Sequence, residues 1–183
     1  LAEAHARSVI HLDLKPSNIM LERISGRGEL ARVLDFGIAA VKSDKGHAPR
    51  ARGHIVLGTP RYMAPEQFSR EGASIASDLF SVGLVLDECL RGTPTFQSTE
   101  MPVYLGQHFE SLPPPPSGTP PGLAAIRNRL LAPTPDLRPP SAKAAREFLL
   151  DWLRGSEAMS LPVPHLAALD AEQTVATATT DEF

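Results

Sequence analysis

The sequence predicts an α+β fold that is mostly helical and contains one short β-hairpin. Residues 77–92, SDLFSVGLVLDECLRG, are apolar around most of a helical circumference, which is typical of a buried helix. Two short apolar runs, 19–22 and 30–36, lie on either side of the turn sequence SGRG and predict the hairpin. Residues 122–132 and 140–154 predict two further helices.

The N-terminal half predicts short elements separated by loops. Residues 1–8 are typical of the end of a helix, whose apolar positions Leu1, Ala4 and Ala6 lead without a cap into Val9 and Ile10. Residues 9–18 lack a helical period, and Pro16 removes a backbone donor, so a loop is expected there. The polar and basic residues 42–54 predict an exposed loop, and PEQF at 65–68 predicts a short helix.

The C-terminal half predicts a buried helix followed by a surface connection and two covering helices. Ser77 is the expected N-cap of the buried helix, and Gly92 is its expected stop. The proline-rich residues 112–121 predict an extended surface segment, and Trp152 is expected to close the core. From residue 155 to residue 183 the composition turns to Ala, Thr, Pro and acidic residues, which indicates a disordered tail or linker.

Composition excludes several classes of protein. The formal charge is −3 with a pI near 6.1, so no basic balance favours a nucleic-acid partner. A single cysteine, Cys89, rules out a disulfide framework and favours a reducing, cytoplasmic compartment. No apolar run approaches the roughly 20 residues of a membrane span. Because the chain starts at Leu1 inside a helical pattern, we expect it to be part of a longer protein, which could itself be membrane-anchored.

Three short motifs occur in a fixed order along the chain. HLDLKPSN occupies residues 11–18, DFG occupies 35–37 and APE occupies 64–66. Each of the two tripeptides alone is a weak signal, but all three in this order exclude coincidence. Asp13, Asn18 and Asp35 in these motifs carry side-chain oxygens, the atom type that hard divalent cations prefer.

These motifs resemble the C-terminal lobe of a Hanks-type serine/threonine protein kinase of bacterial character. The resemblance covers about residues 1–153 and implies a protein-kinase-like fold, with a C-lobe at residues 1–154. It also implies ATP and Mg²⁺ as cofactors, with Mn²⁺ possible, and a protein as substrate. No glycine-rich loop, strand lysine or partner glutamate precedes the first motif, so the N-lobe is absent from this chain and would be its partner in the same polypeptide.

The resemblance assigns chemical roles to five residues. Asp13 would accept the proton of the substrate hydroxyl, and Lys15 would place positive charge against the transferring phosphoryl group. Asn18 and Asp35 would bind the metal ion through oxygen atoms. Met20 would lie under the adenine ring of the nucleotide. Lys15 and these last three residues are therefore the predicted cofactor-binding set.

Further positions match the family through architecture. Thr59 and Glu66 would belong to the activation segment that meets the substrate. Glu66 is expected to form an ion pair with Arg138, and Asp78 is expected to hold the backbone of residues 11–13. The residues with predicted structural roles are His11, Phe36, Asp78 and Arg138.

One departure from the family concerns regulation. Leu12 stands where these kinases typically carry an arginine that holds a phosphorylated activation loop, and leucine has no donors for this. Between Gly37 and Gly58 the only hydroxyl is Ser43. Two interpretations stay open: an active kinase that is not switched by loop phosphorylation, and a pseudokinase or interaction module without turnover.

Overall fold

The computed structural model describes residues 1–25, 28–35, 40–41, 60–68, 72–96 and 112–157. The α+β prediction is confirmed, because helices are combined here with two small antiparallel sheets. The helices are α1 (Ala2–Ala6), α2 (Ile75–Arg91), α4 (Pro121–Leu130) and α5 (Ala142–Glu157), and the strands are β1 (Val9–Ile10), β2 (Ile19–Ile24), β3 (Gly28–Val33) and β4 (Ala40–Val41). Within the described ranges there are also four single-turn 3₁₀ helices: η1 (Pro16–Asn18), η2 (Pro60–Tyr62), η3 (Pro65–Phe68) and η4 (Pro135–Leu137).

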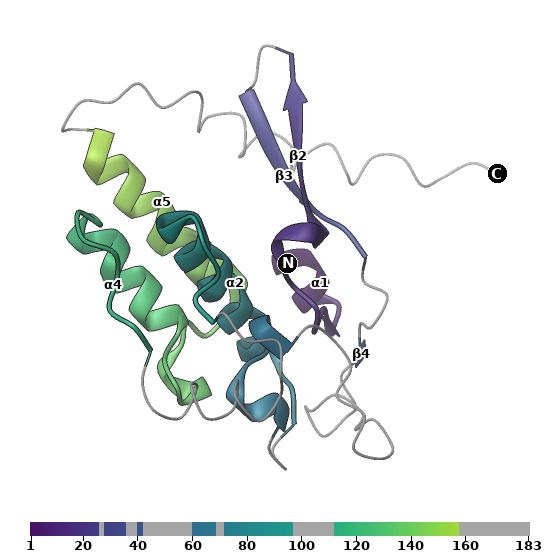
Figure 1. Cartoon of the computed structure of the whole chain (residues 1–183). Coiled ribbons are helices and arrows are strands. Elements are labelled where there is room, and N and C mark those ends of the chain that lie inside the picture. The colour runs from purple at the N-terminus through teal and green to yellow at the C-terminus, as the bar shows by residue number, and fades with distance from the viewer. Residues whose placement is uncertain (26–27, 36–39, 42–59, 69–71, 97–111, 158–183) are drawn as a thin grey trace.

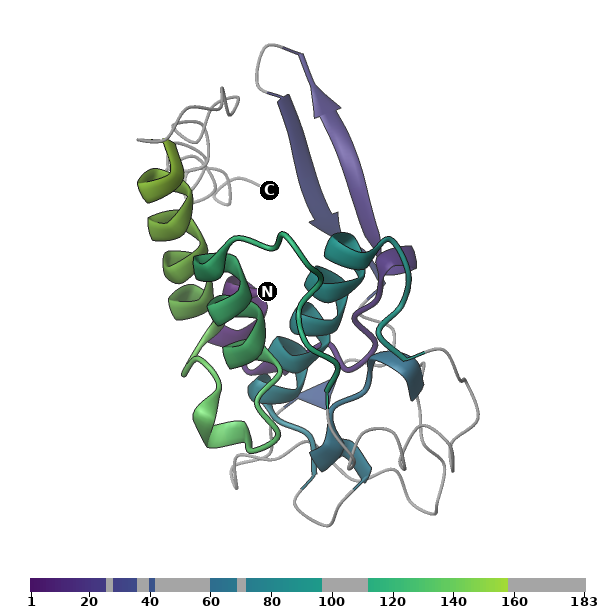
Figure 2. The same cartoon turned by 60° about the vertical axis from the view of Figure 1, so that its left-hand side comes forward.

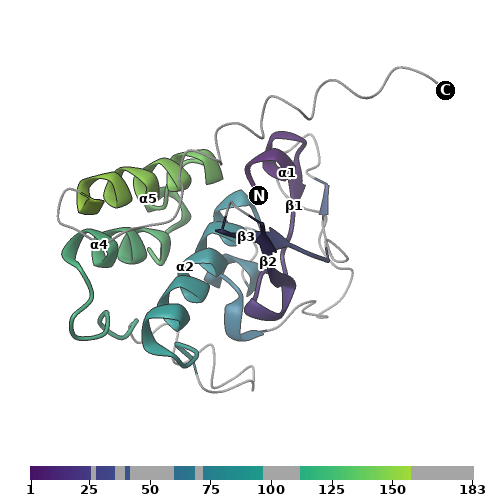
Figure 3. The same ribbon diagram turned by 90° about the horizontal axis from the view of Figure 1, so that it is seen from above.

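The helices and the hairpin occupy different sides of the molecule. Helix α2 packs against α4 and α5, and α1 packs against α5. In Figure 1 the hairpin of β2 and β3 stands apart from this helical group, and Figure 2 shows it projecting beyond the end of α2. Seen from above in Figure 3, α2 lies between the pair α4 and α5 and the strands. None of the described helices is long and apolar enough to cross a bilayer.

The N-cap of helix α2 lies three residues before the predicted one. Ser74 caps it, because its hydroxyl accepts a hydrogen bond from the Ala76 amide at 3.2 Å. The Ser77 hydroxyl accepts in turn from the Ser74 amide at 3.0 Å, which completes a capping box. Ser77 therefore belongs to the first turn rather than to the cap. The predicted stop is confirmed, since Gly92 ends the helix in a left-handed conformation with a φ of 74°.

The core lies on two sides of α2. On one side Phe80 and Leu84 pack with Ala64, Phe96 and Leu131, and all five are buried. Each fully buried leucine or phenylalanine side chain contributes about 1.5–3 kcal/mol to folding. On the other side, a second cluster joins α2 to α4 and α5; it consists of Leu79, Leu130 and Ala145.

Close approach of α2 and α4 depends on Gly83. A Cβ atom built at this position would lie 2.8 Å from Leu131 Cδ2 and 2.9 Å from Leu130 Cβ. Such distances are too short for carbon atoms in a packed interior. The absence of a side chain at residue 83 therefore lets the two helices meet.

Helices α4 and α5 pack through an aromatic contact near residue 122. A Cβ atom at Gly122 would lie 2.5 Å from Trp152 Cδ1, so the indole covers the first turn of α4 while staying half-buried. The Arg129 guanidinium stacks 5.0 Å from the ring centre of Phe148. Helix α5 runs to Glu157, whereas the helix predicted from sequence ended at residue 154.

The strands extend the predicted hairpin and add one unexpected pair. Strands β2 and β3 pair antiparallel from Ile19–Val33 to Ile24–Gly28, which is longer at the turn end than predicted. Strand β1 pairs with β4, although residues 9–18 were predicted to be loop throughout. A two-residue pair between segments about thirty residues apart carries too little local pattern to be recognised in the sequence. The predicted loop at 42–54 lies outside the described residues.

Candidate functional site

The loop between β1 and β2 carries the first motif, and its polar side chains contact one another. The Lys15 ammonium lies 2.7 Å from Asp13 Oδ2. The Asn18 side-chain amide donates to the Asp13 carbonyl at 2.8 Å and to Asp13 Oδ2 at 3.3 Å. The side chains of Asp13 and Lys15 remain 12% and 24% exposed, so a ligand can reach them. The structure thus brings together three of the predicted site residues.

A short 3₁₀ turn holds this cluster together. Pro16 begins η1, where its fixed φ fits and its missing N–H costs nothing. The backbone amide of Asn18 closes the turn by donating to the Lys15 carbonyl at 2.9 Å. Asn18 is consequently 93% buried and points back to Asp13 across the turn, which explains the five-residue spacing in the motif.

Asp78 in the first turn of α2 anchors the start of the loop. Its Oδ2 accepts a hydrogen bond from the His11 amide at 2.8 Å, and its Oδ1 accepts from the Leu12 amide at 2.9 Å. The predicted contact between Asp78 and the loop backbone is therefore confirmed. The His5 ring also donates to Asp78 Oδ2 at 2.8 Å, a contact that no motif in the sequence signalled.

The His11 ring joins the loop to the end of β3. Its Nδ1 accepts a hydrogen bond from the Asp13 amide at 3.3 Å, so Nε2 carries the proton and donates to the Leu34 carbonyl at 3.0 Å. The ring is fully buried. Both nitrogens are thus engaged with backbone, which supports the expected structural role rather than a catalytic one.

Asp35 follows β3 beside the same loop. The Leu34 amide donates to the Asn18 carbonyl at 2.8 Å, so the backbone just before Asp35 is bonded to the end of the motif loop. Asp35 is exposed and has a φ of 55°, an unusual value for a residue other than glycine. Strained backbone of this kind gathers at functional sites. The rest of the second motif, including Phe36, lies outside the described residues.

The donor set of the loop fits a hard cation. The Asn18 amide nitrogen is directed at Asp13, so the amide oxygen is the atom available to a metal. The exposed carboxylate of Asp35 supplies a second oxygen. Amide and carboxylate oxygens are the protein ligands that Mg²⁺ accepts, usually beside water and substrate phosphates. The residues present therefore fit the predicted ion.

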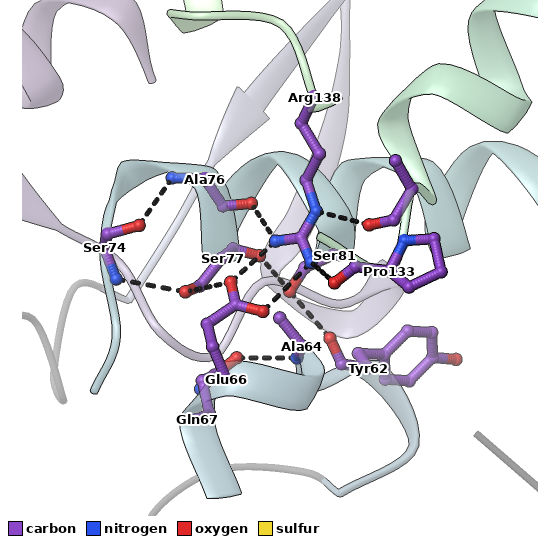
Figure 4. Close-up of polar contacts among 11 residues, drawn as sticks. Tyr62, Ala64, Glu66, Gln67, Ser74, Ala76, Ser77, Ser81, Pro133 and Arg138 are labelled. Carbon is purple, nitrogen blue, oxygen red and sulfur yellow. Dashed lines mark hydrogen bonds and ion pairs between the residues drawn. The ribbon is translucent and has the colours of Figure 1, made fainter. Parts of the chain in front are cut away.

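Glu66 in η3 and Arg138 form a two-pronged ion pair, shown in Figure 4. Arg138 Nη1 lies 2.6 Å from Glu66 Oε1, and Nη2 donates to Oε2 at 2.9 Å. Ser77 at the start of α2 donates to Glu66 Oε1 at 2.7 Å. Both charged side chains are buried. The predicted ion pair between residues 66 and 138 is confirmed.

The remaining donors of Arg138 reach three backbone carbonyls on two segments of the chain. They reach the carbonyls of Ala132, Ala76 and Pro133 at 2.8, 2.9 and 3.1 Å (Figure 4). The guanidinium also lies 4.7 Å above the centre of the Phe80 ring. Arg138 thereby fastens the segment of the APE motif to α2 and to the end of α4.

Comparison with known proteins accounts for this combination of loop, aspartates and buried ion pair. Residues 1–149 match the protein kinase domain family. The chain belongs to this family.

Curated relatives support the bacterial character of this kinase domain. The serine/threonine-protein kinase Pkn1 of Myxococcus xanthus is 39% identical over 153 residues, which cover 81% of this chain and 22% of Pkn1. The serine/threonine-protein kinase PknB of Mycolicibacterium smegmatis is 34% identical over 175 residues, or 93% of this chain and 27% of PknB. The chain therefore spans about a quarter of the length of these relatives.

Of the predicted activation segment, residues 60–68 are described. The Tyr62 phenol donates to Glu88 at 2.6 Å, and the Ser81 hydroxyl donates to the Tyr62 carbonyl at 2.7 Å. Burial, and then the hydrogen bond to the Glu88 carboxylate, raise the pKa of Tyr62 well above its ordinary value. Tyr62 thus stays a neutral donor at physiological pH. Thr59 lies outside the described residues.

The residues matched to the adenine site lie near the surface. Met20 on β2 is 44% exposed. Below it in the family pattern, Val85 is half-buried and Cys89 is exposed on α2. The buried face of α2 therefore does not include Cys89. Near the C-terminus of the helix, Asp87 lies on the buried face instead.

A second charged cluster on α2 was not recognised in the sequence. Asp87 is fully buried and binds Arg127 Nε at 2.7 Å, Arg91 Nε at 2.5 Å and the Thr95 hydroxyl at 2.7 Å. Burial alone would raise the pKa of Asp87, but the hydrogen bonds from Arg91, Arg127 and Thr95 outweigh it and lower the pKa. Arg127 also donates to the Pro113 carbonyl at 2.8 Å, which fixes the proline-rich segment. The four-residue spacing of Asp87 and Arg91 on a predicted helix was the one sequence pattern that could have indicated this ion pair.

Proposed function

We propose that the chain is the C-terminal lobe of a serine/threonine protein kinase that transfers the γ-phosphate of ATP to serine or threonine hydroxyls of a protein substrate. The observation that supports this most directly is the hydrogen-bonded cluster of Asp13, Lys15 and Asn18 beside Asp35. Phosphoryl transfer requires positioned groups and balanced charge more than covalent chemistry by the protein. This cluster offers a base, a cation and oxygen ligands within one loop.

Asp13 and Lys15 act on the two reacting partners. The Asp13 carboxylate accepts the proton of the substrate hydroxyl and orients the oxygen toward the γ-phosphate. The Lys15 ammonium, on its flexible stem, reaches from Asp13 to the transferring phosphoryl group and offsets its negative charge. The hydrogen bonds from Asn18 keep the carboxylate of Asp13 in one orientation for this purpose.

Asn18 and Asp35 are the proposed metal ligands. A bound Mg²⁺ neutralises phosphate charge and holds the phosphates in register. Asn18 offers its amide oxygen from the end of η1, and Asp35 offers its carboxylate from the end of β3. The backbone bond between Leu34 and Asn18 keeps the two ligand-bearing segments adjacent.

The hairpin supports the assignment as one lobe of a larger domain. Met20 and Leu21 on β2 are 44% and 66% exposed, and the hairpin projects from the helices in Figure 2. A two-stranded hairpin by itself is marginally stable in water, so a covering surface is expected. We infer that an N-terminal lobe supplies this surface and the glycine-rich loop, and that the C-lobe ends after α5. The 183-residue chain alone should therefore transfer little or no phosphate.

Leu12 concerns the regulation of the proposed kinase and also supports a second candidate function. Its apolar side chain is half-buried and cannot pair with a phosphate, which supports a kinase that does not need loop phosphorylation. The same leucine in place of the family arginine also supports the second candidate, a pseudokinase without turnover. Treatment with phosphatase and the variant Ser43→Ala should leave the rate of an active enzyme nearly unchanged; a large loss restored by rephosphorylation at Ser43 would contradict this.

The decisive experiment uses the protein encoded by the complete reading frame. Transfer of labelled phosphate from ATP to a serine/threonine peptide library should be measurable with Mg²⁺ or Mn²⁺. Asp13→Ala should lower the rate roughly 10²- to 10⁴-fold, because a positioned general base contributes that much. Asp136→Ala, an exposed acidic residue of η4, is the matched control and should be neutral. Absence of transfer by the unmodified protein would favour the pseudokinase, and equal rates for Asp13→Ala would refute the assigned base.

A further inference from the structure

Two serines on α2 face the segment that carries the third motif. Ser77 and Ser81 are four residues apart, so their side chains lie one above the other on the same face of the helix. Both are buried, at 0% and 3% exposure. Figure 4 shows both hydroxyls directed at the segment of residues 62–66. The central helix therefore contacts this segment through two neutral polar groups.

Each serine binds one end of segment 62–66. The Ser81 hydroxyl donates to the Tyr62 carbonyl at 2.7 Å, and the Ser77 hydroxyl donates to Glu66 Oε1 at 2.7 Å (Figure 4). The first bond holds the backbone, and the second holds the side chain that pairs with Arg138. The segment is thus fixed at both ends from successive turns of one helix.

The helix alone does not account for Ser81. Alanine is favoured over serine in the middle of a helix, and a buried hydroxyl without a partner is unfavourable. Such a serine often donates to the carbonyl four residues earlier. Ser81 lies 3.2 Å from that carbonyl, on Ser77, but it has one proton and its contact with Tyr62 is shorter. What the hydroxyl adds at this position is therefore the bond to the segment.

Ser77 has a second contact that leaves its proton available. Its oxygen accepts from the Ser74 amide at 3.0 Å in the capping box, and its proton goes to Glu66. Between the two bound ends, Met63 and Ala64 are 1% and 0% exposed. Segment 62–66 is consequently held by hydroxyls and by packing, which form together with α2.

These contacts need no covalent modification. A phosphorylated loop is ordered when its phosphate pairs with arginine, and Leu12 cannot supply that donor. A serine hydroxyl on a buried helix is a donor whether or not the chain is phosphorylated. The ordering that the family arginine gives through a phosphate therefore has an alternative source in α2.

We propose that Ser77 and Ser81 are positioning residues that keep segment 62–66 ordered without phosphorylation of the activation loop. They act on the backbone at residue 62 and on the carboxylate at residue 66, and they touch none of the proposed reacting groups. The effect on the segment rests on these contacts alone. The consequence for substrate binding rests on the proposed kinase function.

The first test removes one hydroxyl and follows the segment by hydrogen exchange at single-amide resolution, on the protein encoded by the complete reading frame. The reporters are the amides of Met63 and Ala64, which lie between the two bound ends. In Ser81→Ala, both should exchange about fivefold faster, because one neutral hydrogen bond contributes about that factor. Ser77→Ala should accelerate the same two amides from the other end of the segment.

Two controls separate a local change from general destabilisation. Ser74→Ala removes the N-cap of the same helix but leaves both contacts with the segment in place. The Leu131 amide, bonded to Arg127 at the end of α4, reports on the rest of the domain. Relative to that amide, Ser74→Ala should change exchange in the segment by less than about twofold. Equal acceleration by Ser74→Ala and Ser81→Ala, or no acceleration by either segment-binding serine variant, would overturn the proposal.

A second test removes phosphate instead of a hydroxyl. Complete dephosphorylation, verified by intact mass, should leave exchange of the Met63 and Ala64 amides within about twofold of the untreated protein. An acceleration as large as that in Ser81→Ala would show that a phosphate orders the segment, and the proposal would then be wrong.

The activity assay distinguishes failure of this inference from failure of the proposed function. Ser81→Ala should raise KM for a peptide substrate about threefold, because the substrate must then order the segment on binding, while KM for ATP stays unchanged. Ser74→Ala should change neither value. Faster exchange in Ser81→Ala of a protein that transfers no phosphate would support the positioning role and refute the kinase activity. An active protein in which Ser81→Ala changes neither exchange nor KM for the peptide would refute the positioning role alone.

Discussion

Helix α2 carries two fully buried aspartates whose surroundings differ. Asp78, in the first turn, accepts hydrogen bonds from two backbone amides and one histidine. Asp87, more than two turns later, binds two arginines and a threonine hydroxyl. The Asp78 carboxylate is thus paired mainly with neutral N–H groups of the candidate catalytic loop. The Asp87 carboxylate is paired mainly with charged arginines at the other end of the helix.

The difference separates two uses of a buried charge. At Asp87, the arginines come from α2 itself and from α4, so the cluster joins helices and fixes the segment at Pro113. At Asp78, the partners are loop backbone, so the carboxylate determines a local conformation. Loss of the Asp87 carboxylate should mainly lower global stability. Loss of the Asp78 carboxylate should mainly change the conformation of the loop. The predictions below are ordered from the largest expected effect to the smallest.

Asp87→Ala should cause the largest loss of stability. It leaves the buried guanidinium of Arg127 without its carboxylate, and breaking a buried ion pair from one side costs about 3–5 kcal/mol. Urea denaturation would measure the free energy of unfolding. Asp151→Ala is the control, since Asp151 pairs with Arg154 on the surface, and it should cost no more than about 1 kcal/mol. If Asp87→Ala lowers the free energy of unfolding as little as the control does, the cluster of Asp87 does not stabilise the contact between α2 and α4.

Acid should reproduce part of this loss without a mutation. The pKa of Asp87 is lowered from its ordinary value of 3.8, so the unfolded chain takes up this proton at a higher pH than the folded protein. The contribution of Asp87 is therefore complete well above pH 4 and disappears as the pH falls through that value toward the folded pKa. Asp87→Asn should show a shallower fall in unfolding free energy between pH 6 and pH 3. Parallel curves for the two proteins would contradict the prediction.

Asp78→Asn should cost less stability but change the loop more. The isosteric amide keeps one acceptor and turns an NH₂ group toward a donating backbone amide, which costs about 1–3 kcal/mol. Exchange of the His11 and Leu12 amides should accelerate beyond the global change, which Asp87→Ala should not do. A stability loss larger than that of Asp87→Ala would reverse the comparison between the two aspartates.

Ser74→Ala should give the smallest effect at the Asp78 end of α2. Removal of this N-cap costs about 1 kcal/mol because the first-turn amides lose their acceptor. Thermal unfolding followed by circular dichroism would measure it. Ser117→Ala, in the exposed turn before α4, should leave the midpoint unchanged. A Ser74→Ala protein as stable as the Ser117→Ala protein would show that Ser77, the cap expected from sequence, can replace Ser74.

Local patterns predicted most of the described fold. The apolar run at 77–92 and Gly92 predicted α2 and its end because helix period and a left-handed stop are encoded by neighbouring residues. The N-cap was misplaced from Ser74 to Ser77 because both serines belong to one capping box. The pairing of β1 with β4 was missed because it joins two dipeptides far apart in sequence.

In the candidate site, motif residues were predictable and their supports were not. Contacts of Asp78 with the loop and of Glu66 with Arg138 followed from the family resemblance. The bond between Asp87 and Arg127 spans forty residues and depends on the crossing of α2 and α4, which no local pattern encodes. His5 lies in a short helix of ordinary composition, and only the folded chain shows that its ring meets Asp78.

Gly83 acts as a spacer for the charged cluster that follows it. It lies one helical turn before Asp87, at the point where α2 touches Leu130 and Leu131 of α4. A single added methyl group there would push α4 outward and carry Arg127, on the same helix, away from its carboxylate. The glycine and the aspartate four residues later therefore depend on the same close contact between α2 and α4. Redesign of this domain, or exchange of its helices with those of a relative, should transfer both residues together or neither.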